Sequence, residues 1–306
     1  MRFVKNLFIT ISLLLCFTVA ACQDKRNAIN DEGAWGFIDT AGKCVINPQF
    51  DYAELFSEGL APVSLKKKFG FIDKTGRYVI APQFDNAHWF ENGLAPVQIG
   101  DKWGFIEKTG KFVIDLRFED TGLFSENFAP VKADGKWGYI GTKGEYTIQP
   151  RFDKARRFTE GLACVSFEGK FGFVYPDGRY AIDPQFDDSG LFFESLAPVK
   201  SVGKWGFIDK NGKYVITPRF DDAGQFSGGL APVRRGDKFG YINKKGEFVI
   251  APRFEAALWF SEGLAPVRLD GKWGFVDKAG QYGIDQQFGA TLRFSEGLAP
   301  VKFLSK

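Results

Sequence analysis

The chain has 306 residues, of which 44% are apolar and 25% are charged, and its formal net charge is +3. So balanced a charge gives no electrostatic reason to expect nucleic acid as a partner. With one histidine, His88, and four cysteines, the sequence offers little material for a metal centre, and we expect neither a metal nor a cofactor.

The first 21 residues have the pattern of an export signal. Arg2 and Lys5 form a basic start, an apolar run extends from Leu7 to Ala21, and small residues directly precede Cys22. The run is shorter than the roughly 20 residues that span a bilayer. The segment resembles the lipobox of bacterial lipoproteins, and this resemblance implies that Cys22 is acylated and becomes the first residue of the mature chain. Ordinary signal-peptidase cleavage beside a coincidental cysteine is the alternative.

The residues after this cysteine are polar and show no repeat, so residues 22–34 are expected to form a tether. In bacterial lipoproteins, an aspartate after the acylated cysteine favours retention in the inner membrane. Gln23 stands there in this chain. The resemblance therefore implies an exported protein held by a lipid anchor, in the outer membrane if the cell has one.

From Trp35 onward one unit of 34 residues recurs eight times without insertion or deletion. Such a fixed period is the signature of a solenoid, a propeller or a repeat array. An aromatic residue followed by glycine marks the start of each unit: Trp35-Gly36, Phe69-Gly70, Trp103-Gly104, Trp137-Gly138, Phe171-Gly172, Trp205-Gly206, Phe239-Gly240 and Trp273-Gly274. Positions within the unit are called slots below, with this aromatic residue as slot 0.

Turn residues and short apolar runs predict a β-meander in every unit. Asp209-Lys210-Asn211-Gly212 has the form of a type I turn closed by a left-handed residue, which explains the glycine found at slot 7 in every copy. Hairpin dipeptides such as Asp134-Gly135 join the Leu-Ala-Pro-Val run to the next Trp-Gly run. We expect at least three antiparallel strands per unit, strand pairing that stops at the proline of slot 13, and either a fourth short strand or a packed turn. The phenylalanines at slots 15 and 21 are expected in the core.

The two ends of the repeat region complement each other. The region opens on a Trp-Gly strand without a preceding Leu-Ala-Pro-Val strand, and it closes on Leu298-Ala299-Pro300-Val301 without a following Trp-Gly strand. Pairing of the last strand with the first would close a propeller-like ring with few exposed edges. The expected fold is therefore all-β, with a closed ring favoured and an open β-solenoid as the alternative.

Lys204-Trp205-Gly206-Phe207-Ile208-Asp209, Gly212-Lys213-Tyr214-Val215-Ile216 and the Phe-Ser-Glu-Gly-Leu-Ala-Pro-Val segments resemble the bacterial WG-repeat family. The resemblance covers residues 35–301 as one repeat domain and leaves 302–306 as a C-terminal tail. It implies an exported or envelope-associated β-repeat protein, and it implies no particular biochemistry.

The remaining candidates for chemistry have structural alternatives. Acids recur at slot 16 in seven units: Asp51, Asp85, Glu119, Asp153, Asp187, Asp221 and Glu255. A pair of them could serve a glycosidase, but seven copies favour a structural role and a protein that is not an enzyme. Cys44 and Cys164 are interpreted as small apolar substitutes rather than as a disulfide or a metal site, because units three repeats apart are not expected to bring them within bonding distance.

Slot 20 is the most variable large position and precedes an invariant phenylalanine, so its side chain should point to the opposite face. Trp89 and Trp259 occupy it in two units and are candidate ligand-binding residues that could stack on a sugar or a protein surface. Filling gaps over the neighbouring repeat is the alternative role. We expect a non-catalytic, membrane-anchored protein that binds a protein or polysaccharide of the cell envelope, with a lectin-like binder and, less favoured, a repeat-fold hydrolase as alternatives.

Overall fold

The computed structural model describes residues 34–304, which form 31 β-strands and contain no helix. Four kinds of strand recur, in a fixed order along the chain. The first kind begins at slot 17 and is two residues long except in β15: β3 (Tyr52–Ala53), β7 (Asn86–Ala87), β11 (Asp120–Thr121), β15 (Lys154–Thr159), β19 (Asp188–Ser189), β23 (Asp222–Ala223) and β27 (Ala256–Ala257). The Leu-Ala-Pro-Val strands follow: β4 (Leu60–Leu65), β8 (Ala95–Ile99), β12 (Phe128–Ala133), β16 (Leu162–Phe167), β20 (Ala197–Ser201), β24 (Ala231–Arg235), β28 (Ala265–Leu269) and β31 (Leu298–Phe303).

The Trp-Gly strands are the third kind: β1 (Trp35–Asp39), β5 (Lys68–Asp73), β9 (Lys102–Ile106), β13 (Lys136–Gly141), β17 (Lys170–Val174), β21 (Lys204–Ile208), β25 (Lys238–Ile242) and β29 (Lys272–Val276). The fourth kind carries the Ile of slot 11: β2 (Cys44–Phe50), β6 (Tyr78–Phe84), β10 (Phe112–Phe118), β14 (Tyr146–Phe152), β18 (Tyr180–Phe186), β22 (Tyr214–Phe220), β26 (Phe248–Phe254) and β30 (Tyr282–Thr291). The first kind therefore supplies the fourth short strand that the sequence left open.

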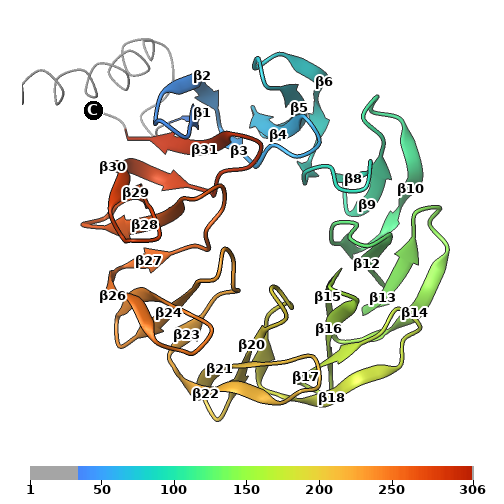
Figure 1. The fold of residues 1–306 in the computed structure, drawn as a ribbon. Coiled ribbons are helices and arrows are strands. Elements are labelled where there is room, and N and C mark those ends of the chain that lie inside the picture. Colours follow the sequence, from blue (N-terminus) through green and yellow to red (C-terminus); the bar gives the residue numbers. More distant parts are fainter. Residues whose placement is uncertain (1–33, 305–306) are drawn as a thin grey trace, which may run out of the picture.

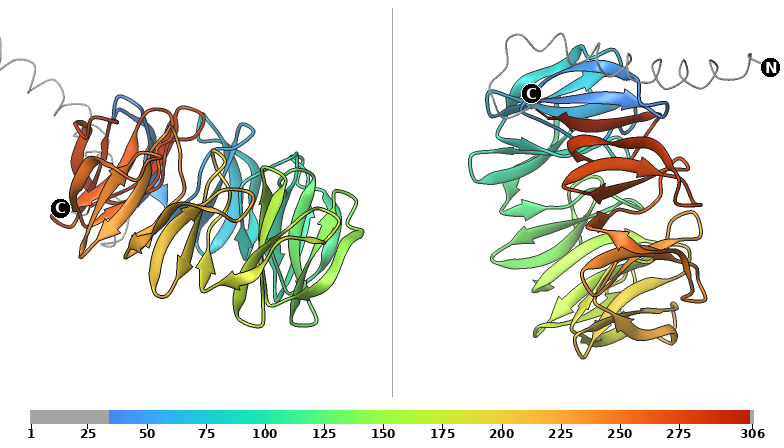
Figure 2. Two further views of the ribbon diagram at one scale, coloured as in Figure 1. Left: turned by 60° about the horizontal axis from the view of Figure 1, so that its bottom comes forward. Right: turned by 90° about the vertical axis from the view of Figure 1, so that its left-hand side faces the viewer.

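In each of the six four-stranded sheets the four kinds pair in this order, and all pairs are antiparallel, as in the order β3-β4-β5-β6. Each of these sheets takes two strands from one sequence repeat and two from the next. The sheets are arranged around a common centre, with β6, β10, β14, β18 and β22 on the outside (Figure 1). The two turned views show that the sheets also extend along the axis about which they are arranged, so the molecule is thick as well as wide (Figure 2).

This offset brings the first and last repeats into one sheet. The seven-stranded sheet has the order β2-β1-β31-β30-β29-β28-β27, so β1 lies beside β31. Five residue pairs join these strands, from Trp35 opposite Lys302 to Asp39 opposite Leu298. β30 is ten residues long because it first pairs with β29 and then, in its second half, with β31.

The core lies between neighbouring sheets and is built by the residues that all repeats share. The phenylalanines of slots 15 and 21 are buried in every repeat, as expected. Phe37 of β1, for example, contacts Phe56, and Phe71 contacts Phe90, with ring centroids 4.9 Å apart in both pairs. Of the slot 0 tryptophans, Trp35 and Trp103 are buried, and the others pack half-buried against the core clusters.

Two glycines of the unit are required for different structural reasons. Gly212 has a φ of 78° and donates its N–H to the Asp209 carbonyl at 3.0 Å, as the predicted turn requires. At slot 1 the constraint is space, since a Cβ on Gly206 would lie 2.5 Å from the carbonyl oxygen of Ile216. The Trp-Gly signature thus records a close approach between adjacent strands.

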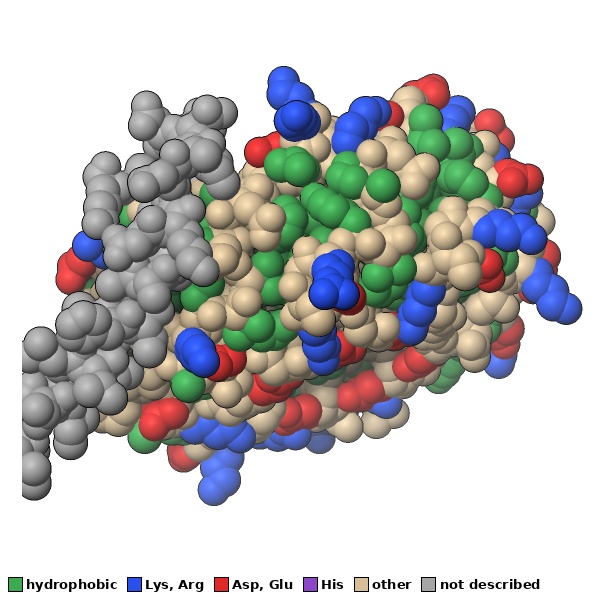
Figure 3. Space-filling model, turned by 90° about the horizontal axis from the view of Figure 1, so that it is seen from above, with side chains coloured by type: hydrophobic (Ala, Val, Ile, Leu, Met, Phe, Trp, Pro, Cys, Tyr) green, Lys and Arg blue, Asp and Glu red, His purple; other side chains and the backbone are tan. Residues whose placement is uncertain are grey.

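The expected effect of the slot 13 proline was wrong. Pro218 lies inside β22, and pairing with β21 continues past it to Phe220, with a register shift along the way. β22 is the edge strand of its sheet, where a residue without an N–H is tolerated. The outer strands also expose apolar side chains, among them Val79 and Val249. Hydrophobic groups of this sort lie among charged ones on the face seen in Figure 3.

Candidate functional site

A polar contact between neighbouring repeats recurs near the short strands. Glu194, at slot 23, has a φ of 53° and accepts the N–H of Gly229 in the next repeat at 3.1 and 3.2 Å. Lys244 binds the same carboxylate at 3.1 Å and also donates to the Glu194 carbonyl at 3.0 Å. We call this Glu–Gly–Lys arrangement the clip. Burial raises the pKa of Glu194, but the Gly229 N–H and Lys244 outweigh it and the net pKa is lowered.

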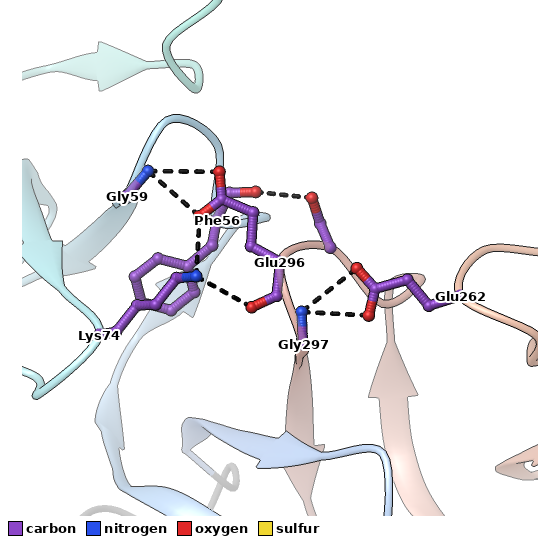
Figure 4. A network of polar contacts seen from close by, with 7 residues as sticks. Phe56, Gly59, Lys74, Glu262, Glu296 and Gly297 are labelled. Atoms are coloured by element: carbon purple, nitrogen blue, oxygen red, sulfur yellow. Dashed lines mark hydrogen bonds and ion pairs between the residues drawn. The ribbon is translucent and has the colours of Figure 1, made fainter.

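The same clip joins the last repeat to the first. Glu296 accepts the N–H of Gly59 at 3.2 Å and pairs with Lys74 at 3.0 Å, while Gly297 donates to Glu262 one repeat earlier (Figure 4). The Ser295 hydroxyl also donates to the Phe56 carbonyl at 2.7 Å. The contact between repeats eight and one therefore repeats the contact found inside the chain.

The slot 16 acids are held in structural contacts. Asp221 accepts the Nζ–H of Lys204 and, at 2.7 Å, the N–H of Gly236 in the hairpin turn of its own sheet. Three further lysines donate to slot 16 acids in the same way: Lys68 to Asp85, Lys136 to Asp153 and Lys170 to Asp187. These contacts with a lysine and a hairpin N–H agree with a structural role for the acids.

A different set of residues meets near the centre of the arrangement. Nη1 of Arg157 donates to Oε2 of Glu91 at 3.1 Å across 66 positions of the sequence. The guanidinium of Arg293 lies over the ring of Trp259, 5.3 Å from its centroid. These residues, together with Trp89 beside Glu91, are called the central cluster below. They occupy slots 20 and 22 in repeats two, four, seven and eight.

Electrostatic coupling shows that the two parts of the central cluster are close. Burial, then the positive charge of Arg157, lowers the pKa of Arg293, and Glu91 acts in the opposite direction. Burial raises the pKa of Glu91, partly offset by Arg157, Trp89 and Arg293. These residues belong to repeats two, four and eight, so the fold brings together side chains that are far apart in the sequence.

His88 and Glu54 form a smaller polar group at slot 19. Nδ1 of His88 lies 3.4 Å from Oε1 of Glu54, and the imidazole stacks on Trp103 with ring centroids 5.5 Å apart. Oε2 of Glu54 is buried without a hydrogen-bond partner. The only histidine of the chain therefore packs within the fold against an aromatic residue of the Trp-Gly strand.

The two predicted tryptophans lie where the slot pattern placed them. Trp89 and Trp259 are half-buried, whereas Phe90 and Phe260, the next residues, are buried. Their role in ligand binding stays a prediction. Sequence reasoning missed Glu91, Arg157 and Arg293 as a group. Variability at slot 20 was the available signal for the two arginines, but only the fold shows that they meet.

Both Cys44 and Cys164 were expected to be small apolar substitutes, and only Cys164 fits that expectation. Cys164 is free and buried, and burial raises its pKa to about 11, as suits a small apolar substitute. The interpretation of Cys44 was wrong, because it is disulfide-bonded. Cys22, the export signal and the tether up to residue 33 lie outside the described residues.

Eight consecutive segments of the chain match the family described as WG containing repeat, namely 35–69, 69–103, 103–137, 137–171, 171–205, 205–239, 239–273 and 273–306. The chain belongs to the WG-repeat family. No curated protein sequence matches this WG-repeat protein.

Solved structures similar to the WG-repeat protein are propeller-like. A eukaryotic initiation factor aligns with a TM-score of 0.56 at 9% identity, over 85% of this chain and 86% of the other. The dihydro-heme d1 dehydrogenase NirN gives 0.55 at 9% identity, over 85% and 74%. Kluyveromyces lactis Hsv2 gives 0.51 at 11%, over 77% and 96%. At such low identity the likeness shows a propeller-type all-β fold and nothing of activity.

Between residues 34 and 304, no three or more His, Cys, Asp or Glu side chains are grouped so that they could hold a metal ion. The same part of the chain has no helix that is long and apolar enough to cross a membrane.

Proposed function

We propose that this WG-repeat protein is a non-catalytic binding protein of the cell envelope, exported and anchored through a lipid on Cys22. Its repeats form a closed ring that holds a rigid surface for a protein or a polysaccharide. The observation that carries the proposal is that shared residues and repeat-specific residues have different structural roles. Residues shared by all repeats form the cores and turns, and those shared by most repeats form the clips, whereas Trp89, Glu91, Arg157, Trp259 and Arg293 are repeat-specific and come together in the central cluster.

Two contacts support closure of the ring. The β1–β31 pairing leaves no free edge between the first and last repeats, and the Glu296 clip ties repeat eight to repeat one. A closed ring fixes residues from distant repeats relative to one another. Such preorganisation lowers the entropy cost of binding.

A lectin-like role is favoured over a hydrolase. Aromatic faces beside charged hydrogen-bonding groups are the usual means of holding a sugar. A glycosidase would need two carboxyl groups facing one bond, and the recurring acids at slot 16 are engaged with lysines and hairpin turns.

Site-specific photo-cross-linking in intact cells tests binding at the centre. We would place a benzophenone amino acid at position 259 and, as a matched control, at position 249 on an outer strand, where Val249 is exposed. Adducts with an envelope protein or glycan at position 259, and far fewer at 249, are expected. Equal labelling at both positions, or none at 259, would contradict the proposal.

The anchor is tested separately. Cys22→Ser should block processing or release the protein from membranes, and mass spectrometry of the wild-type N-terminal peptide should show an acyl-glyceryl group on the cysteine. Cys164→Ser is the matched control, since this thiol is buried and free. Unchanged membrane association of the Cys22 variant would refute lipid anchoring.

A further inference from the structure

Arg293 is the least satisfied charged group of the central cluster. It is half-buried, and its guanidinium lies over Trp259 and within electrostatic range of Arg157 and Glu91. It has no carboxylate within ion-pair distance and no hydrogen-bond acceptor in that part of the chain, whereas Arg157 is paired with Glu91. A guanidinium has five N–H donors, and leaving them without acceptors in a partly desolvated place is costly.

The cation–π contact with Trp259 is not a hydrogen bond, so it leaves those N–H donors without an acceptor. An arginine packed flat on an aromatic ring is held by cation–π attraction, while its N–H groups point outward in the plane of the guanidinium. Such an edge matches the two oxygens of a carboxylate, and bidentate pairs of this kind are among the stronger hydrogen bonds in proteins. Trp259 therefore positions Arg293 for an acceptor that the described chain does not supply.

The net charge of the central cluster also favours a ligand with a carboxylate. Arg157 and Arg293 carry two positive charges, and Glu91 carries one negative charge, so the set is left with one positive charge. Glu58, which also acts on Glu91, is engaged in its own clip with Lys108 at 3.0 Å. A ligand with one carboxylate would neutralise the cluster.

The remaining groups suit a sugar ring. Trp89 is a half-buried indole beside Glu91. An aromatic face packs against the C–H face of a sugar, and a carboxylate accepts hydrogen bonds from sugar hydroxyls. A peptide backbone offers fewer hydroxyl-type donors, which favours a saccharide over an acidic peptide.

We propose that the central cluster binds an acidic saccharide, with Arg293 holding the sugar carboxylate, Glu91 accepting from hydroxyls and Trp89 packing on the ring. This inference rests on the proposed binding function and specifies its ligand class. Arg157 fixes the Glu91 side chain at 3.1 Å and adds to the positive potential that attracts the acid.

Isothermal titration calorimetry tests the ligand class on the mature protein. The probes are trigalacturonic acid, trimannuronic acid and sialyllactose, with the methyl ester of each acid, lactose and a hexaglutamate peptide as comparisons. At least one acid should bind, and its methyl ester should bind about tenfold more weakly or worse, because esterification removes a charge-assisted hydrogen bond. Binding by none of the acids, equal binding of acid and ester, or tighter binding of hexaglutamate would overturn the proposal.

Variants locate the site. Arg293→Ala should weaken acid binding about tenfold or more, and Arg293→Lys should restore part of it, because lysine keeps the charge but not the planar fork. Gln225→Ala is the matched control, since Gln225 occupies slot 20 in repeat six outside the central cluster. A loss equal in Gln225→Ala, or no loss in Arg293→Ala at unchanged melting temperature, would place the acid elsewhere. Adducts at position 259 without any acid preference would leave the binding function standing and refute this inference alone.

Discussion

The residue type at a shared slot of this protein is determined by the local structure of the repeating unit. Glycine at slot 7 is required by a left-handed backbone, with a φ of 78° at Gly212. Space adds little to this requirement, since a Cβ there would lie 3.4 Å from the Ile182 side chain of the preceding repeat, an ordinary van der Waals distance. The backbone conformation of the turn therefore decides the residue.

Gly212→Val is expected to destabilise the protein by more than about 1 kcal/mol, because a β-branched side chain opposes positive φ. Thermal unfolding followed by circular dichroism measures the effect. Gly212→Asn is the control, since asparagine tolerates this conformation, and its loss should be smaller. Equal losses would mean that space rather than backbone geometry decides the position.

The slot 16 acids predict a pH effect. The Lys204 ammonium and then the Gly236 N–H hold the pKa of Asp221 below its ordinary value of 3.8. A lowered pKa in the folded state gives stability that is present above pH 3.8 and lost as the pH falls through the folded value. Wild type should therefore melt above Asp221→Asn at pH 6, and the difference should shrink at pH 3 and below. A difference that is constant between pH 6 and pH 2 would contradict this assignment.

At the scale of the element, the strands were predictable because their signals are local. Hairpin dipeptides, the slot 7 turn and the buried phenylalanines lie within a few residues of the backbone they determine, and the structure confirms them. The prediction that pairing stops at the slot 13 proline was wrong, because proline is tolerated at a sheet edge. Whether a strand such as β22 lies at an edge depends on the whole sheet. The clips and the pairing of Arg157 with Glu91 could not be predicted, since they depend on which repeats face each other.

Two repeats lack the glutamate of the clip, with Asn92 and Gly228 in its place, and the carboxylate can be supplied at Gly228. Gly228 has a φ of 63°, and Nζ of Lys278 lies 2.9 Å from where its Cβ would be. Gly228→Glu should complete the clip to the Gly263 N–H and to Lys278. We expect it to be more stable than Gly228→Ala by about 1 kcal/mol, the contribution of a typical hydrogen bond.

Urea unfolding of both variants measures the difference. The alanine variant carries the same backbone strain without a carboxylate, so it isolates the clip. Equal stability of the two would show that the carboxylate contributes nothing at this position.

On the scale of the molecule, the sequence suggested closure through its complementary ends, and β1 does pair with β31. If the ring is closed in solution, this pairing should be as durable as pairing inside the chain. Hydrogen exchange should then protect the amides of Trp35–Asp39 and Leu298–Phe303 as well as those of β20 and β21. Fast exchange confined to β31 would instead indicate an open array.

The seven-stranded sheet, which contains both β1 and β31, forms from strands that are synthesised at different times. β1 and β2 are made first, but the strand that pairs with β1 is the last one to be translated. Until then their sheet keeps an unpaired edge, and its contacts span nearly the whole chain, the kind of pairing that forms slowly. A chain cut short before Leu298 lacks β31 altogether. This sheet is therefore completed only after all the repeats between β1 and β31 have been made.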